Sequence, residues 1–236
     1  PALVPAAIVG GTALSYVAAF LLNVPALVPF LNVMPAFPFM IGSLGRGRVG
    51  EAVWRMLIWA AALAVCATTL SYFDTVDSGR LFIRGETYRR EMFEYLRTGY
   101  GPEGDIRRFL PTHAAHAAAF GILAIATGSL LAMPLGALLM NYMAYYAGAL
   151  GAASQDPWLA MGLAWAPWAL VRIASFVTLG VVLGAPVLAR LFRFEYRLRD
   201  RMRWIGLAAA GLAADVALKW AIAPAWREML RAAAGW

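Results

Sequence analysis

The stretch from Arg107 to Ala153 constrains the fold more than any other part of the sequence. After Arg-Arg-Phe-Leu-Pro-Thr-His-Ala-Ala-His it runs for about forty residues without a charge, interrupted once by Pro134. A bilayer hydrocarbon core of ~30 Å needs only about 20 helical residues, so one straight helix cannot account for this length. Because proline interrupts a helix, we expect a hairpin that folds back at Met133 and Pro134.

The composition places the whole chain in the membrane. Hydrophobic residues make up 62% of the sequence and charged residues 14%, with a mean hydropathy of +0.66. Soluble domains carry roughly 25% charged residues. Apart from closed barrels, only helices satisfy their backbone groups in lipid, so we predict an all-α, polytopic helical bundle. Residues 1–236 are expected to form a single transmembrane domain of about six spans.

The N-terminal region is expected to contain a broken segment in addition to those spans. Residues 1–44 carry no charge, and Pro25, Pro29, Pro35 and Pro38 crowd their second half. Proline removes a backbone donor, so this half should be kinked, broken or re-entrant. Such breaks build binding sites in transporters, but proline is also common in ordinary membrane helices. Whether residues 1–44 cross once or twice stays open, and the missing initiator methionine suggests a true start further upstream.

The charge pattern predicts the orientation of the spans. The connections Gly45–Arg55 and Arg190–Arg203 are rich in arginine, which is typical of cytoplasmic loops. Residues 73–111 contain seven arginines and seven acidic residues, so we place them outside. Within them Glu86–Leu96 has the pattern of an amphipathic helix, expected on the membrane surface. The remaining spans are predicted at about Val53–Tyr72, Thr112–Met133, Leu135–Ala153, Leu170–Ala189 and Trp204–Ala223, the last ended by Pro224, with Leu159–Trp168 as an interfacial or re-entrant piece.

Cellular setting and partners follow from the same counts. The basic residues are nineteen arginines and one lysine, which with abundant alanine and glycine suggests a GC-rich bacterial genome and hence the inner membrane. The net charge of +7 lies in short loops beside apolar runs, so nucleic acid is not an expected partner. The expected partners are membrane lipids and other membrane-protein subunits. A single cysteine, Cys66, excludes a disulfide within the chain and a cysteine-based zinc site.

Two histidines are the candidate metal ligands. His113 and His116 are spaced i, i+3 at the start of a predicted span, so both can reach one metal ion or ligand. Two ligands do not complete a metal site, and no HExxH-type motif supplies a third. The alternative is a pair of interfacial histidines that hydrogen-bond to neighbouring residues.

Three polar residues within the predicted spans are candidate ligand-binding residues. Arg172 should lie close to the outer interface, where it either reaches back to water or binds an anionic headgroup. Asp215 falls near the middle of the last span, where an unpaired carboxylate is costly. Lys219, one turn further on, would form a local ion pair with it. The alternative is an ion- or proton-carrying Asp215 that faces Asn141.

Tyr145 and Tyr146 complete the candidate ligand-binding set, as residues that line a cavity or lie in the interfacial aromatic belt. The sequence contains no recognised catalytic or cofactor-binding motif, so it assigns no cofactor. It favours a non-enzymatic subunit of a transporter or larger membrane complex. The alternative is a membrane enzyme that acts on a lipid or lipid-linked substrate at the outer interface through His113 or His116.

Overall fold

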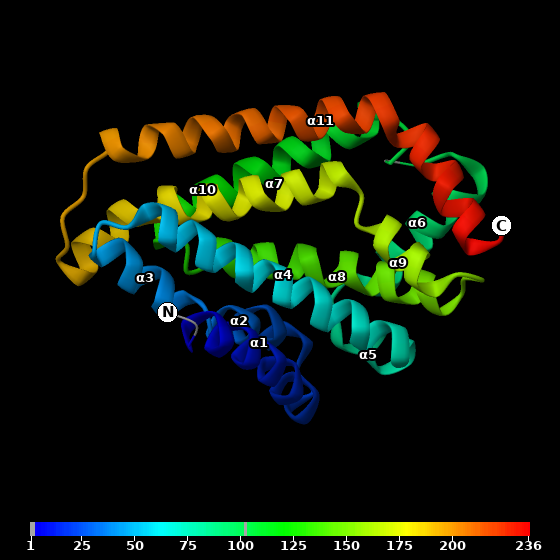
Figure 1. Ribbon diagram of the computed structural model, residues 1–236, viewed down its shortest axis with the longest axis horizontal. Helices are drawn as coiled ribbons and strands as arrows, with labels where there is room; N and C mark the ends of the chain where they lie inside the picture. The colour runs from blue at the N-terminus through cyan, green and yellow to red at the C-terminus, as the bar shows by residue number, and fades with distance from the viewer. Residues whose placement is uncertain (1–2, 102) are drawn as a thin grey trace.

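The structure is a computed structural model that describes residues 3–101 and 103–236. That part of the chain folds into helices and contains no strand, which confirms the predicted all-α bundle (Figure 1). The elements are α1 (Leu3–Leu22), η1 (Pro25–Leu27), α2 (Val28–Val33), α3 (Phe37–Gly45), α4 (Val49–Phe73), α5 (Thr75–Leu81), α6 (Gly85–Thr98), α7 (Ile106–Thr127), α8 (Ala132–Ala152), α9 (Pro157–Ala164), α10 (Pro167–Phe192) and α11 (Arg199–Ala234).

Six helical segments of the described chain are long and apolar enough to cross a membrane. They are α1, the broken segment Pro25–Gly45, α4, α7, α10 and residues Arg201–Ala234 of α11. The chain is therefore a polytopic membrane protein. Helix α8 is of similar length and lies inside the bundle, where fourteen of its 21 residues are buried.

The proline-rich segment breaks where the prolines require it. Pro25, Pro29 and Pro38 occupy the first or second positions of η1, α2 and α3, where the missing N–H group would lack a helical partner anyway. Pro35 lies in the turn between α2 and α3. The prediction of a broken segment is confirmed.

Helix α8 forms the centre of the bundle, with α4 packed along it. The two helices approach closely at Gly148, where an added Cβ would collide with the backbone of Thr68 and Tyr72. Gly151 makes a similarly close approach to Met161 of α9. These glycines allow the backbones to approach, as small residues do in membrane helix pairs.

The two ends of the bundle differ in charge. At one end the basic connections meet, because Gly45 lies against Phe194 and Gly50 against Trp204. At the other end the N–H of Asp156 donates to the carbonyl of Ala233 at 3.2 Å, and α5, α6 and the end of α11 gather there (Figure 1). Both arginine-rich connections therefore share one side; that this side is cytoplasmic remains a prediction.

Three predicted helix ends were wrong in detail. The hairpin turns at Gly128–Leu131, where Gly128 and Ser129 have positive φ, and Pro134 lies in the first turn of α8. Helix α7 begins at Ile106 rather than at about Thr112, so Pro111 lies inside it. Pro224 lies inside α11, which continues to Ala234 because its final turns pack Leu230 and Ala233 against neighbouring helices. Tertiary packing there offsets the hydrogen bond that proline removes.

The amphipathic helix predicted at Glu86–Leu96 exists as part of α6, but its apolar face does not face lipid. Met92 and Leu96 of α6 are buried against Tyr146 and Leu150 of α8. The helix ends at Gly99, whose φ of +78° is a left-handed C-cap conformation. Helix α6 therefore covers one end of the bundle.

Candidate functional site

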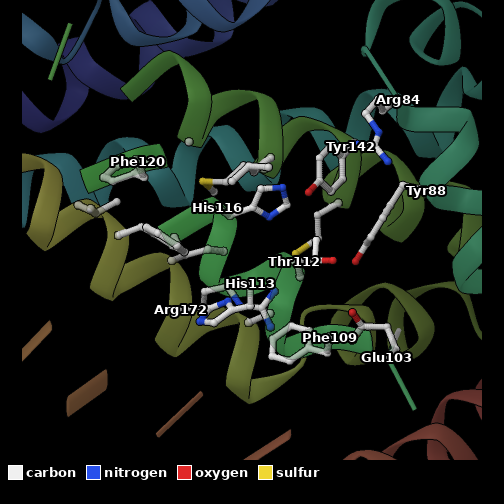
Figure 2. A pocket seen from close by; sticks show the side chains of 18 of the residues that line it. Arg84, Tyr88, Glu103, Phe109, Thr112, His113, His116, Phe120, Tyr142 and Arg172 are labelled. Carbon is white, nitrogen blue, oxygen red and sulfur yellow. The ribbon is translucent and has the colours of Figure 1, made fainter. Parts of the chain in front are cut away.

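A cavity of about 300 Å³ lies beneath α6, between α7, α8 and α10 (Figure 2). Its polar lining residues come from the start of α6, from the connection that follows it, from the second and third turns of α7, from α8 and from the second turn of α10. Most of its apolar lining lies deeper in the bundle, whereas Phe109 lies beside the polar groups. The polar lining consists of Arg84, Tyr88, Glu91, Glu103, Thr112, His113, His116, Tyr142 and Arg172. The apolar lining includes Trp59, Phe109, Phe120, Met133, Leu139, Met140, Met143, Ile173, Phe176 and Val177. The cavity is thus polar at one end and apolar at the other.

Helix α7 places both histidines on the cavity wall. His113 and His116 are separated by three residues, so they lie on one face of the helix, and both line the cavity. The ring of His113 is stacked on Phe109 with 5.0 Å between the centroids and meets the edge of Phe176 at 6.2 Å. These contacts fix the orientation of the His113 imidazole, whereas His116 projects into the open space of the cavity (Figure 2).

Arg172 and Asp215 form a buried ion pair behind His113. The guanidinium of Arg172 donates from Nε and Nη2 to the two carboxylate oxygens of Asp215 at 2.8 and 2.9 Å. The side chain of Asp215 is fully buried, and Nε2 of His113 lies 3.5 Å from its Oδ2. This bidentate arrangement is the strongest form of the arginine–carboxylate contact. His113, Arg172 and Asp215 therefore form one connected polar group on the cavity wall.

A second ion pair closes the same corner of the cavity. Nζ of Lys219 lies 2.9 Å from Oε2 of Glu103, and it also lies 3.4 Å from the ring centroid of Phe109. Glu103 belongs to the connection between α6 and α7, so this pair joins that connection to α11. Both contacts place opposite charge or an aromatic face beside an ammonium group that is almost fully buried.

These pairings correct the predictions for Asp215 and Arg172. The expected local pair of Asp215 with Lys219 does not form, because both side chains find better partners on other elements. Arg172 turns toward Asp215 rather than back to the interface. Asp215 also lies next to residues near the starts of α7 and α10, so it is not an isolated charge at mid-membrane.

Asn141 belongs to a separate polar network and does not face Asp215. Its amide donates to Oδ1 of Asn32 at 2.8 Å, and its carbonyl oxygen accepts from the Tyr16 hydroxyl at 2.6 Å. Asn32 donates in turn to Ser15, and its backbone carbonyl accepts from Trp59 Nε1 at 2.7 Å. The network is buried and hydrogen-bonded throughout, and it joins α1 and the broken helix α2 to α8. A structural role explains it fully.

Tyr145 and Tyr146 lie outside the cavity. The hydroxyl of Tyr145 donates to Glu86 at 3.0 Å or to the carbonyl of Thr75 at 3.2 Å, which ties α5 and α6 to α8. The hydrogen bond from Arg89, with that from Tyr145, holds the pKa of Glu86 below its ordinary value. Tyr146 is buried against α6. Both tyrosines therefore hold α5 and α6 against α8.

The described residues offer no metal centre. Within residues 3–101 and 103–236, no group of three or more His, Cys, Asp or Glu side chains is arranged to hold a metal ion. Metal binding by His113 and His116 therefore stays a prediction without a third ligand of this kind.

Several cavity residues had no distinguishing signal in the sequence. Glu103 is one of seven acidic residues in residues 73–111, and Tyr142 is one of three tyrosines close together in the sequence of α8. Arg84 lines the cavity with a φ of +64°, a left-handed conformation that non-glycine residues rarely adopt. Only the tertiary structure reveals that outlier, and such outliers gather at functional sites.

Comparisons with protein-family models, curated proteins and solved structures found no match. The function is therefore argued from the geometry of the cavity alone.

Proposed function

We propose that this chain is a membrane protein that binds a lipid-like molecule in the cavity beneath α6. The observation that supports the proposal is the division of the lining into a polar end and an apolar interior. An amphiphile would place its head among Tyr88, His116 and Tyr142 and its apolar part against Phe120, Met133 and Val177. The volume of about 300 Å³ is at the lower end of the range for small-molecule sites, so it accommodates a head and the first part of a tail.

Gly136 offers a test that changes the cavity without disturbing the packing. It lines the cavity, and a Cβ added there would meet only the ring of Phe120, at an ordinary distance of 3.4 Å. A side chain can therefore start at this position, and Gly136→Leu is expected to extend into the cavity and occupy part of it. Circular dichroism checks that the variant folds. Gly10→Leu is the matched control, because Gly10 lies on the exposed face of α1 with nothing within 4 Å of an added Cβ.

The measurement is mass spectrometry of lipids that remain bound after purification in mild detergent. Wild type and Gly10→Leu should retain the same lipid-like molecule, and Gly136→Leu should lose most of it. Equal retention by all three proteins would contradict the proposal, because the bound lipid would then lie outside the cavity.

A specific observation also supports acid–base chemistry on the bound molecule. A carboxylate beside a histidine orients the imidazole and stabilises its protonated form. Asp215 is placed to do this for His113, and Arg172 holds Asp215 in position. In this enzyme version of the proposal, His113 accepts a proton from a hydroxyl group or water at the lipid head. A positioned general base contributes about 10²–10⁴-fold to the rate.

The enzyme version is tested by following lipids over time in reconstituted vesicles. Wild type should convert a lipid of the extract, and His113→Gln should bind it but convert it at least a hundredfold more slowly. If the wild type leaves the lipid composition of the vesicles unchanged, the enzyme version fails and only lipid binding remains. The sequence-based expectation of a subunit of a transporter or larger complex then becomes the function to test, by native mass spectrometry for partner chains.

A further inference from the structure

The charged groups around the cavity are largely neutralised by the protein itself. Arg172 uses two of its nitrogens for Asp215, and Glu103 is paired with Lys219. Arg84 and Glu91, of opposite charge, are the remaining charged lining residues, and both are exposed at the rim. An anionic headgroup in the interior would therefore meet a cation whose charge a buried carboxylate already offsets, which weakens the attraction for a second anion.

The neutral polar groups of the cavity show the opposite pattern. Tyr88, Thr112, His116 and Tyr142 line the cavity, and none of these side chains forms a hydrogen bond to another residue of the described chain. They point into the cavity from two sides, from α7 and from α6 and α8 (Figure 2). Tyr88, His116 and Tyr142 are half-buried, and half-buried donors usually have partners, whereas Thr112 is exposed. Four hydrogen-bonding groups are thus left for a ligand.

We propose that the ligand carries an uncharged, oxygen-bearing head on an apolar tail. This inference rests on the proposed function and specifies its ligand class. Carbonyl, ester or hydroxyl oxygens of such a head accept hydrogen bonds from the tyrosine and threonine hydroxyls and from the imidazole of His116. The rings of Tyr88 and Tyr142, with centroids 4.6 Å apart, form a wall beside it. A prenyl quinone and a diacylglycerol share this chemistry.

The charge of the head is tested with a pair of lipids that differ in one group. Dioctanoylglycerol and dioctanoylphosphatidic acid have the same tails, and only the second carries a phosphate. A decyl-substituted benzoquinone is the third probe, and it tests whether the neutral head is a quinone rather than an acylglycerol. Calorimetric titration of the protein in mild detergent should show at least tenfold tighter binding of one neutral probe than of the phosphatidic acid.

Removal of single hydroxyl groups tests the contacts. Tyr142→Phe should weaken binding of the neutral probe about three- to tenfold, the range of one net hydrogen bond. Thr112→Val gives a second reading at a position that is exposed to the cavity and does not depend on helix packing. Tyr100→Phe is the control, because Tyr100 is exposed and does not line the cavity.

The outcomes separate this inference from the proposed function. Tighter binding of the phosphatidic acid that is lost in Gly136→Leu would overturn the uncharged head and leave lipid binding in the cavity intact. Neutral-probe binding that is unchanged in Tyr142→Phe and Thr112→Val would also overturn it. If no probe binds in a way that Gly136→Leu abolishes, the proposed function and the inference fail together.

Discussion

The ion pair between Arg172 and Asp215 allows a quantitative prediction. Asp215→Asn keeps the volume of the side chain but removes its charge, and the guanidinium of Arg172 stays protonated at any accessible pH. Loss of one partner of a buried pair costs about 3–5 kcal/mol. Asp215 is fully buried, whereas the side chain of Arg172 is 23% exposed, which favours the lower end of that range.

A loss of about 3 kcal/mol corresponds to a fall in Tm of roughly 6–12 °C for a domain of this size. The assay is circular dichroism during heating in mild detergent, at one heating rate for all variants because unfolding of a membrane protein is rarely reversible. Asp77→Asn is the matched control. Its partner Arg80 and Asp77 itself are both more than half exposed, so the Tm should change by no more than about 2 °C.

A double variant separates pairing from other effects of the mutation. Arg172→Met combined with Asp215→Leu removes both charges, so it should be more stable than Asp215→Asn. A Tm for Asp215→Asn within 2 °C of wild type would refute the reasoning. The reasoning would also be refuted if the double variant lost as much stability as Arg172→Met and Asp215→Leu lose together when measured as single variants.

Three other parts of the structure give further predictions. Gly148→Ala should lower the Tm measurably because its Cβ would collide with the backbone of α4, whereas Gly162→Ala, which meets nothing within 4 Å, should not. Asn141→Leu should cost about 2–4 kcal/mol in the same assay, since two buried hydrogen-bonding partners lose their contacts. The lowered pKa of Glu86 means that its contribution to the docking of α6 is present above the ordinary pKa of 4.5 and is lost as the pH falls through the lower, folded-state value. Hydrogen exchange of α6, corrected for intrinsic rates, should therefore accelerate at acid pH in wild type and show no such pH dependence in Glu86→Gln.

Most of the fold could be predicted from local properties of the sequence. Three of these properties are the length of each apolar run, the prolines between Val24 and Met40, and Gly99 after α6. Each determines the backbone conformation only within a few residues of its own position. Arginines are concentrated in two connections, which predicted that both connections lie at one end of the bundle. The structure has them there. These features depend on hydrocarbon thickness and backbone geometry, which are the same for any chain in a bilayer.

Helix boundaries were predicted less well where tertiary packing opposes a local preference. Pro224 ought to end a helix, yet α11 continues because Leu230 and Ala233 bury their side chains against other helices. The apolar face of α6 was correctly identified, but its partner was not. Periodicity shows that a face is apolar and does not show whether lipid or α8 covers it.

The sequence by itself thus determined that this protein is a helical membrane bundle, and that His113, His116, Arg172 and Asp215 are polar residues in an apolar setting. Only the tertiary structure decided their partners. Asp215 has a lysine one turn away on its own helix, but it pairs with an arginine 43 residues earlier in the chain. The physical reason is that a buried charge selects the partner with the best geometry in space, and that partner depends on how α7, α10 and α11 pack. The cavity has the same origin, because it is the space that those packed helices, together with α8 and α6, leave between them.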